Sequence, residues 1–355
     1  MGICHERCPY FNRYSSLTGI GPYIMKAFFI NRYKDTGQIG QLPDPEVGHN
    51  DVLVQVHAAS INLLDAKIRK GEFKLILPYR FPLVLGNDLA GVVVRVGRNV
   101  RQFKAGDEVY ARPPEDRIGS FAELIAVKEE ALALKPTNLD MEQAASIPLV
   151  ALTAWQVLVE TAQLKKGQRV LIHAGSGGVG TIAIQLAKHL GAFVATTTST
   201  RNVEWVKSLG ADVVIDYKTQ AFESVLKDYD VVLNSLGNDV LEKSLQVLKP
   251  GGRLISISGP PTPAFAKQQG LSWFLKQVLR LLSRRIRQKA DKRGVRYNFV
   301  FMRADGDQLR DITALIESGV IKPVIDRAFP LEATAEALAY AEQGRSKGKV
   351  TISIR

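Results

Sequence analysis

Residues 170–180 read Val170-Leu171-Ile172-His173-Ala174-Gly175-Ser176-Gly177-Gly178-Val179-Gly180. A short apolar run leads into Gly175-x-Gly177-x-x-Gly180, and apolar residues at helical spacing then continue as far as Gly191. Strand, glycine turn and helix in this order are the setting in which proteins bind a dinucleotide. The glycines let the backbone approach a pyrophosphate, and the helix N-terminus offers it unpaired N–H groups. A glycine turn without a nucleotide is the alternative interpretation.

The end of the next strand indicates which dinucleotide to expect. The strand predicted over 193–198 ends in Thr198-Ser199-Thr200-Arg201, where a protein that binds NAD usually carries Asp or Glu for the ribose 2′-hydroxyl. Hydroxyls and a guanidinium instead suit a 2′-phosphate. We therefore predict NADPH, with Thr198, Ser199 and Arg201 around its 2′-phosphate. Alternatively, Arg201 only caps a solvated helix start.

Composition limits the possible classes of protein. The 355 residues, 46% of them hydrophobic, predict two or three domains with a sizeable core, and no apolar run is long enough to span a bilayer. The net charge of +12 admits an anionic cofactor, a membrane surface or nucleic acid as partner. Only Cys4 and Cys8 occur, so the body of the chain has no disulfide framework and no thiolate metal ligand. We predict a reducing compartment, the cytoplasm.

The N-terminal part of the chain changes character near Met25. Residues 1–24 are polar and turn-rich, which predicts a poorly structured extension and makes Met25 a candidate functional start. Within it, Cys4-His5-x-x-Cys8 is interpreted as part of this leader, because a metal site would need a fourth ligand. From 26 to 127, short β-rich runs alternate with turns, which predicts a small, irregular β domain.

Beyond Met141, helical and strand patterns alternate. Strands predicted over 193–198, 213–216, 231–234 and 254–258, with helices between them, indicate a doubly wound parallel sheet. Ligands of such sheets lie at the carboxyl ends of the strands. This location makes Asn234, Leu236, Ser258 and Gly259 predicted neighbours of the cofactor. The remaining elements are predicted as a strand over 299–303, a helix over 307–318, a strand over 322–329, a helix over 333–342 and a strand over 349–354.

Residues 271–296 form a basic amphipathic segment. Apolar residues recur at helical spacing from Leu271 to Ile286, while nine Lys or Arg residues stand against one acid, Asp291. Such a helix, with Trp273, suits an anionic membrane surface or an acidic partner. The alternative is a lid helix whose apolar face covers the sheet and whose charges are solvated.

Several further motifs, taken with the glycine turn, resemble the medium-chain dehydrogenase/reductase superfamily. They are His57-Ala58-Ala59-Ser60-Ile61-Asn62-x-x-Asp65, Gly86-Asn87-Asp88-x-x-Gly91, Gly106-Asp107-Glu108-Val109, Gly119-Ser120-Phe121-Ala122-Glu123 and Ala151-Leu152-Thr153-Ala154. The resemblance implies a GroES-like, β-rich catalytic domain over 25–149 plus 303–355, with an NADP-binding Rossmann domain over 150–302 inserted into it. It also implies a homodimer.

Two departures indicate the branch. Members that bind a catalytic zinc carry a Cys in the first motif and Gly-His-Glu in the second, and here Ser60 and Asn87 stand at those places. No metal site is therefore predicted, and the chain resembles the zinc-independent quinone oxidoreductases and the enone, or 2-alkenal, reductases. The activity that this implies is transfer of a hydride from NADPH to a quinone or to the activated C=C of an α,β-unsaturated carbonyl.

The resemblance also implies site residues. Asn62 and Lys67 are candidate donors to the substrate oxygen, and Tyr79 is an alternative donor. Each has a plainer interpretation: Asn62 supports its loop, Lys67 is solvated, and Tyr79 packs beside Pro78 and Phe81. Asp65 and Asp88 are expected to organise loops. Implied cofactor contacts are Thr153 at the nicotinamide, Ser176, Gly177, Gly178 and Val179 at the pyrophosphate, and Tyr217 at the 2′-phosphate, although Tyr217 is alternatively a half-buried edge residue.

Two other classes of function stay open. One is a nucleotide-binding interaction protein in which catalysis has lapsed, because fold alone does not secure function. The other is a peripheral membrane protein that docks through 271–296. The chain carries no recognisable nucleic-acid motif, so no nucleic-acid partner is predicted.

Overall fold

The computed structural model describes residues 24–355, which form two compact units. The described part of the first unit is 24–149 with Ala304–Glu317 and Ile325–Arg355, and the second unit is Val150–Arg303 with Ser318–Val324. The predicted extension, with Cys4 and Cys8, lies outside the described residues except for Ile24, where strand β1 begins. None of the helices in 24–355 has both the length and the apolar character of a membrane span.

The first unit is built mainly of antiparallel strands. Its seven-stranded sheet has the order β15-β16-β3-β5-β6-β8, with β7 also paired to β3, and its three-stranded sheet has the order β2-β1-β4. Val52, Val54 and Val56 of β3 are buried together in its core. The strands are β1 (Ile24–Ile30), β2 (Gln38–Pro43), β3 (Asp51–Ile61), β4 (Leu83–Val84), β5 (Leu89–Val96), β6 (Glu108–Ala111), β7 (Leu124–Lys128), β8 (Leu132–Leu134), β15 (Ile325–Pro330) and β16 (Lys349–Ser353).

Four helices accompany these strands. They are α1 (Leu63–Lys70), α2 (Met141–Ala145), α11 (Gly306–Glu317) and α12 (Thr334–Glu342). A further helix, α3 (Pro148–Trp155), begins at the last residues of the first unit and continues into the second. Pro148 suits this helix start, because proline lacks an N–H that the first turn could not pair in any case.

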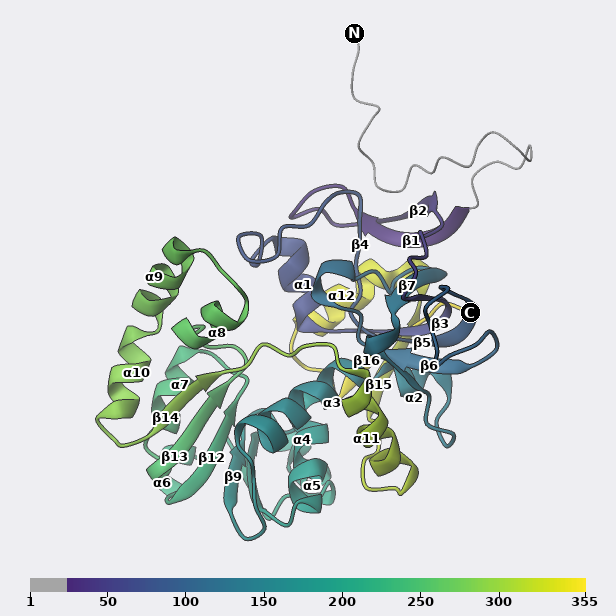
Figure 1. Cartoon of the computed structure of the whole chain (residues 1–355). Coiled ribbons are helices and arrows are strands. Elements are labelled where there is room, and N and C mark those ends of the chain that lie inside the picture. Colours follow the sequence, from purple (N-terminus) through teal and green to yellow (C-terminus); the bar gives the residue numbers. More distant parts are fainter. Residues whose placement is uncertain (1–23) are drawn as a thin grey trace, which may run out of the picture. The chain divides into compact units, whose positions relative to one another are not determined.

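The second unit contains a six-stranded parallel sheet with the order β11-β10-β9-β12-β13-β14. In Figure 1, α4 and α5 lie on one side of this sheet and α7 and α10 on the other. The predicted doubly wound parallel sheet is thus confirmed. The strands are β9 (Arg169–Ile172), β10 (Phe193–Thr198), β11 (Val213–Asp216), β12 (Tyr229–Asn234), β13 (Leu248–Ser256) and β14 (Arg296–Phe299); the helices are α4 (Gly178–His189), α5 (Val203–Ser208), α6 (Phe222–Val225), α7 (Asn238–Ser244), α8 (Pro263–Gln268), α9 (Trp273–Leu282) and α10 (Arg284–Asp291).

Several boundaries differ from the sequence predictions. Strand β13 begins at Leu248, earlier than the strand predicted over 254–258. The last strand of the parallel sheet is β14 at Arg296–Phe299, earlier than the predicted 299–303, because its register pairs Arg253 with Arg296 and Ser256 with Phe299. Residues 303–355 also do not form one piece of the first unit, because Ser318–Val324 groups with the second. Within the second unit, the Gln185 side chain of α4 donates to the Lys322 carbonyl (3.1 Å) and accepts from the Lys322 N–H (2.9 Å).

Candidate functional site

The glycine turn between β9 and α4 fits a bound phosphate. A Cβ on Gly180 would lie 2.3 Å from the Ala174 carbonyl oxygen, so the turn closes only with glycine there. A Cβ on Gly177 would meet only that same oxygen, at 3.4 Å, which leaves open space beside the turn. Gly177 caps α4 without any side-chain hydrogen bond, so no side chain competes for the N–H groups of its first turn. Predicted contacts Ser176 to Val179 therefore surround the N-terminus of a twelve-residue helix.

The His173 side chain holds the residues beneath this turn together, a role that the sequence did not indicate. Its Nδ1 lies 3.1 Å from the Thr197 hydroxyl and its Nε2 lies 2.9 Å from the Ser244 hydroxyl, so the ring links β9, β10 and α7. The Thr197 hydroxyl also accepts from the Ala174 N–H at 3.2 Å. Burial lowers the pKa of His173 to about 3, because the charged ring would lose its hydration. His173 is therefore a neutral structural link at physiological pH.

The end of strand β10 is the predicted place of the 2′-phosphate, and the residues predicted to contact it differ in exposure. The Thr198 hydroxyl is buried and has no hydrogen-bond partner among residues 24–355, and Arg201 is exposed nearby in sequence. Tyr217 directly follows β11, whose Asp216 pairs with Thr198. The side chain of Tyr217 is 59% exposed, so the half-buried alternative is wrong.

The neighbouring strand brings a carboxylate that the sequence reasoning missed, because that reasoning considered only the end of β10. Asp216 accepts a hydrogen bond from the Thr200 side chain, which is the main reason that its pKa is lowered. Asp216 also accepts from the Lys218 N–H at 3.0 Å. This edge of the sheet therefore combines hydroxyls and the cations Arg201 and Lys218 with one carboxylate.

The residues predicted after β12 and β13 do come together, but they bind one another. The Asn234 amide donates to the Leu236 carbonyl at 2.9 Å, and the Ser258 hydroxyl donates to the same carbonyl at 2.7 Å. Asn234 is fully buried, so its side chain shapes the loop from beneath. Thr153 is buried on α3.

A buried polar cluster in the first unit joins the motif at residues 57–65 to the motif at residues 86–91. Asp88 accepts from the Ser60 hydroxyl (2.9 Å), the Asn62 amide (2.8 Å), the Leu149 N–H (2.7 Å) and the Lys349 ammonium (3.2 Å). Lys349 Nζ also donates to the Asn62 side-chain oxygen (2.5 Å) and the Ile61 carbonyl (2.9 Å). Every one of these groups is buried, so the ammonium and the carboxylate neutralise each other away from water.

This cluster bears on two expectations, the donor role of Asn62 and the prediction that no metal site is present. Asn62 donates one amide N–H to Asp88 and accepts from Lys349 through its oxygen, and its amide nitrogen lies 3.5 Å from the Ser60 carbonyl, which favours the loop-supporting interpretation over a donor role toward a substrate. The donor set also does not fit zinc. The Asn87 amide donates to Asp65 (2.7 Å), and an ammonium, which cannot ligate a metal, contacts Asp88. Among residues 24–355, no group of three or more His, Cys, Asp or Glu side chains could hold a metal.

Asp65 is a buried residue in the first turn of α1. Its carboxylate accepts from the Asn62 N–H (2.7 Å) and from the Asn87 amide, which ties the first turn of α1 to the second motif. Burial raises the pKa of Asp65 to about 6. The expectation that Asp65 and Asp88 organise loops matches these contacts.

The two remaining candidate donors, Lys67 and Tyr79, differ in whether their polar hydrogens already form hydrogen bonds within the described chain. Lys67 is half-buried on α1, and its ammonium has no hydrogen bond or ion pair within the described chain. The Tyr79 hydroxyl donates to the Glu115 carbonyl at 2.7 Å, and burial raises the pKa of Tyr79. Its proton is therefore both engaged and tightly held, which favours the packing interpretation.

A buried arginine and a cavity lie near Tyr79. Arg112 is almost fully buried, contacts Glu115 at 3.2 Å and has an unpartnered Nε within the described chain; the sequence offered no signal for it. Tyr79 also lines a cavity of about 420 Å³ in the first unit, together with Phe81, Glu115 and Arg117. Neither Asn62 nor Lys67 lines this cavity.

Comparisons with known proteins match both parts of the chain. Residues 48–137 match the family model described as alcohol dehydrogenase GroES-like domain, and residues 209–352 match the one described as zinc-binding dehydrogenase. The chain is 39% identical to the chloroplastic NADPH-dependent alkenal/one oxidoreductase of Arabidopsis thaliana, over 87% of this chain and 73% of that protein. It is 37% identical to the 2-methylene-furan-3-one reductase of Solanum lycopersicum, over 93% and 79%.

A solved structure agrees with these relatives. The quinone oxidoreductase from Coxiella burnetii superimposes with a TM-score of 0.83 at 31% sequence identity, and the match covers 94% of this chain and all of that one. Similarity therefore extends over both units rather than over the nucleotide-binding half alone.

Proposed function

Because the chain belongs to the medium-chain dehydrogenase/reductase superfamily, in its quinone oxidoreductase and enone reductase branch, we propose that it reduces a quinone or the activated C=C of an α,β-unsaturated carbonyl with NADPH and without zinc. That the chain is an oxidoreductase follows from its relatives; the cofactor, the metal independence and the substrate class are our proposals. The named relatives act on alkenals, enones and quinones, which supports the substrate class.

The observation that carries the proposal is the carboxyl edge of the six-stranded sheet. There a glycine turn with space beside Gly177 opens at the N-terminus of α4, where no side chain bonds the first N–H groups, which suits a pyrophosphate. Thr198 has a buried hydroxyl without a partner in the described chain, and Arg201 and Lys218 are exposed cations at the same edge, which favours a 2′-phosphate. The carboxylate of Asp216 weakens this preference for NADPH over NADH without reversing the sign of the local charge.

NADPH, when bound, supplies the hydride. Reduction of a quinone or an enone leaves negative charge on the substrate's carbonyl oxygen, so the protein must offer a donor to that oxygen. Lys67 is our candidate, because its ammonium is free of other partners in 24–355 while Asn62 and Tyr79 are engaged. The Asn62–Asp65 and Asn87–Asp65 hydrogen bonds fix the first turn of the helix that carries Lys67.

The proposed independence from zinc rests on the donor set. Ser60, Asn87 and the Lys349–Asp88 pair leave the two motifs without a set of metal ligands. Without a Lewis acid, a simple ketone lacks the polarisation that it needs, whereas a quinone or an enone is activated by conjugation. We therefore expect discrimination between these two kinds of acceptor.

The substrate class and Lys67 can be tested in one assay. NADPH oxidation is followed with one quinone, one 2-alkenal, one cyclic enone and one simple ketone. We expect turnover of a conjugated acceptor but not of the ketone, and we expect Lys67→Met to lower kcat about 100-fold, the loss typical of an oxyanion donor. Lys70→Met, on the same helix but paired with Glu342, is the matched control and should change kcat less than about twofold.

Other results would remove parts of the proposal. Reduction of the ketone would contradict the substrate class, and equal activity of the two lysine variants would show that Lys67 is not the donor to the substrate oxygen. NADPH binding without turnover of any acceptor would favour an interaction protein.

Two further proposals come from the sequence and the family resemblance, a homodimer and a cytoplasmic location. Sedimentation analysis of the purified chain tests the first. Cell fractionation tests the second, which competes with an organellar location because the Arabidopsis relative is chloroplastic.

A further inference from the structure

Helices α9 and α10 do not use their apolar residues as a simple lid would. Leu279 of α9 packs with Phe265, Ala266 and Phe299, and Ile286 and Ala290 of α10 join the core beside the sheet. This narrow inner stripe already anchors both helices to the second unit. The apolar residues outside it are therefore not needed to cover the sheet.

Those other apolar residues face solvent. The exposed fraction is 74% for Trp273, 68% for Phe274, 69% for Leu281 and 59% for Leu282, and Val278 is also exposed. Thirteen large apolar residues are exposed among residues 24–355, and these five lie within the ten residues of α9. Scattered exposed side chains are ordinary, but a cluster of this kind marks an interaction site.

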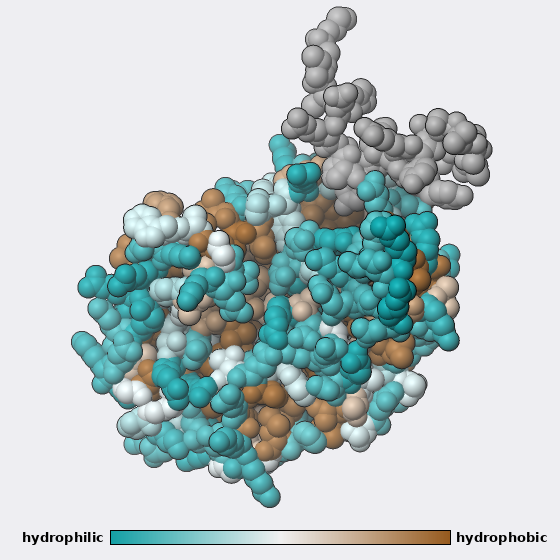
Figure 2. All heavy atoms as spheres, viewed as in Figure 1, coloured by the Kyte–Doolittle hydropathy of each residue, from teal (hydrophilic) through white to brown (hydrophobic). Residues whose placement is uncertain are grey.

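Four of the five residues form one continuous stripe. At about 100° of rotation per residue, Phe274, Val278, Leu281 and Leu282 occupy an arc about 100° wide, and Trp273 lies about 80° beyond Leu281. The buried Leu279 lies about 60° beyond Leu282 at the other edge, so α9 has one wide apolar band whose edge at Leu279 packs inward and whose exposed part is the outer stripe. Figure 2 shows brown and pale atoms over α9 beside teal atoms over α10.

Cations flank the outer stripe. Arg280, Arg284 and Lys292 are exposed and have no ion-pair partner in the described chain, whereas Arg285 and Lys289 both contact Glu242 of α7, at 2.7 and 2.6 Å. Over 271–296 the nine basic residues oppose one acidic residue. We call the five exposed apolar residues of α9 and these three unpaired cations the outer face.

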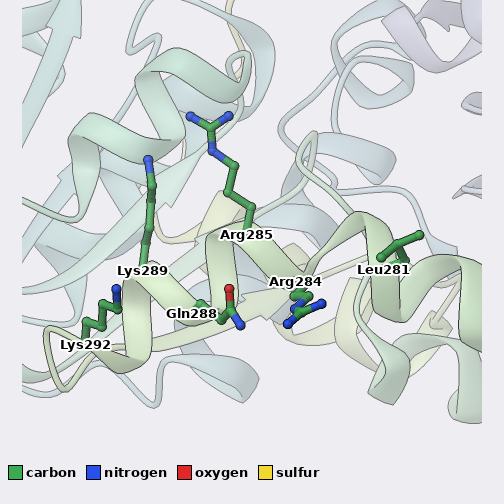
Figure 3. A pocket seen from close by; sticks show the side chains of 6 residues that line it. All are labelled: Leu281, Arg284, Arg285, Gln288, Lys289 and Lys292. Atoms are coloured by element: carbon green, nitrogen blue, oxygen red, sulfur yellow. The ribbon is translucent and has the colours of Figure 1, made fainter.

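Hollows between the side chains bring cations and the apolar stripe together. One of about 350 Å³ is lined by Leu281, Arg284 and Lys292, among others, and Figure 3 shows Arg285 and Lys289 extending to the same side of α10. A second, of about 520 Å³, shares Leu281 and Arg284 and adds Arg280. Both are open and positively charged, which suits small anionic groups such as the phosphates of lipid headgroups.

We propose that the outer face of α9 and α10 docks the protein on an anionic lipid bilayer, with the apolar stripe in the headgroup–acyl boundary and the three cations on lipid phosphates. An exposed aromatic and aliphatic stripe bordered by Arg and Lys is the pattern of helices that lie in a membrane interface. This proposal goes beyond the proposed reaction and does not depend on it, since its readout is adsorption to vesicles.

Charge argues against a second copy of the chain on this face. Two outer faces in contact would bring like charges together at short range, because Asp291, beside Arg280 and Arg284, is the one acidic residue in 271–296 that could offset them. An acidic protein surface would complement the charge, but it would not account for the exposed apolar residues of α9. Open hollows lined by cations beside an exposed apolar stripe fit an anionic lipid surface better.

Flotation of the full chain with vesicles tests the proposal. Vesicles of equal parts phosphatidylcholine and phosphatidylglycerol should carry the protein upward, and pure phosphatidylcholine vesicles should carry little. Raising the salt from about 0.1 M to about 1 M should release it, because the Debye length falls from about 10 Å to about 3 Å. Substituting Arg280→Gln, Arg284→Gln and Lys292→Gln together should weaken partitioning about 100-fold, since each cation near such a surface strengthens binding about fivefold.

Two further variants separate charge from location and from burial. Arg98→Gln, Lys104→Gln and Lys227→Gln remove three exposed cations elsewhere, so the net charge falls equally, yet flotation should be retained. Trp273→Ser with Phe274→Ser and Leu281→Ser should reduce flotation at least about tenfold while NADPH turnover and thermal stability stay unchanged, because these side chains are exposed.

Three results would overturn the proposal. One is absence of flotation with anionic vesicles at low salt, and another is equal flotation with neutral vesicles. The third is equal loss of flotation in both sets of charge variants, which would mean nonspecific attraction. Sedimentation of the serine variant adds a fourth test: a change from dimer to monomer, with no vesicle binding in the original chain, would assign the face to a second copy.

Discussion

Replacement of Lys349 by methionine should destabilise the first unit strongly. Methionine keeps much of the length and removes the charge, so Asp88 stays buried without its counter-charge and the Asn62 oxygen and the Ile61 carbonyl each lose a donor. Breaking a buried ion pair from one side costs about 3–5 kcal/mol. Three other hydrogen bonds still reach Asp88 and moderate the loss, while the two acceptors that lose the Lys349 ammonium add to it. We predict a decrease of about 4 kcal/mol in the free energy of unfolding.

Urea unfolding followed by far-ultraviolet circular dichroism measures this change. Trp155, Trp205 and Trp273 are the three tryptophans of the chain and all belong to the second unit, so tryptophan fluorescence reports that unit separately. Lys128→Met is the matched control: Lys128 is partly exposed and lies 4.0 Å from Glu130, so its loss should cost less than about 0.5 kcal/mol.

A double-mutant cycle identifies the cause. Asp88→Asn combined with Lys349→Met leaves neither charge unpaired, and the double variant should be less destabilised than the sum of the single variants by about 2 kcal/mol. A loss below about 1 kcal/mol in Lys349→Met, or additive single effects, would refute the argument that these two charges stabilise each other.

Three further predictions concern the second unit. Gly180→Ala should lower the free energy of unfolding by about 1–3 kcal/mol and abolish NADPH binding measured by titration calorimetry, because its Cβ would lie 2.3 Å from the Ala174 oxygen. Gly237→Ala is the control and should be neutral, because there is open space around Gly237. A neutral Gly180→Ala would contradict the close turn. His173→Gln should remove a pH dependence: the folded pKa of His173 is about 3 against 6.5 unfolded, so the original chain should lose up to about 1.4 kcal/mol of unfolding free energy per unit as pH falls from about 6.5 toward 3. Asp65 acts with the opposite sign, because its raised pKa of about 6 makes the unfolding free energy fall as pH rises from about 4 to about 6. The effect of His173 is therefore the difference between the curves of unfolding free energy against pH for the original chain and for His173→Gln. Parallel curves would contradict the burial of a neutral His173. Arg201→Ala should raise KM for NADPH about tenfold and leave KM for NADH within about twofold, whereas the exposed Lys207→Ala should change neither; equal effects on the two cofactors would show that Arg201 does not bind the 2′-phosphate.

Local patterns in the sequence were enough to predict the parallel sheet. The glycine turn and the alternation of strands and helices are short-range signals, and strands β9 to β12 form close to their predicted places, whereas β13 begins at Leu248 and not at 254. The segment 271–296 was harder. The Ser283 hydroxyl donates back to the Leu279 carbonyl at 2.8 Å where α9 gives way to α10, so one predicted helix becomes two, and periodicity alone did not show which stripe packs.

The polar cluster in the first unit could not be predicted for a different reason. Asp88 and Lys349 are 261 residues apart, and only the pairing of β16 with β3 brings the lysine to Asn62. A lysine near the C-terminus gives no sign in the sequence that it is buried. Arg112 and Asp216 were missed similarly, since burial and the neighbouring strand determine what they contact.

The most direct test of the central claim is the turnover of metal-stripped protein. After treatment with a chelator and confirmation that zinc is absent, NADPH oxidation is measured with a quinone and a 2-alkenal, and NADH is run in parallel. We predict that the rate with a conjugated acceptor stays within about twofold of the untreated protein, and that kcat/KM is at least about tenfold higher for NADPH than for NADH. Loss of activity that zinc restores, or an equal kcat/KM for the two cofactors, would contradict this prediction.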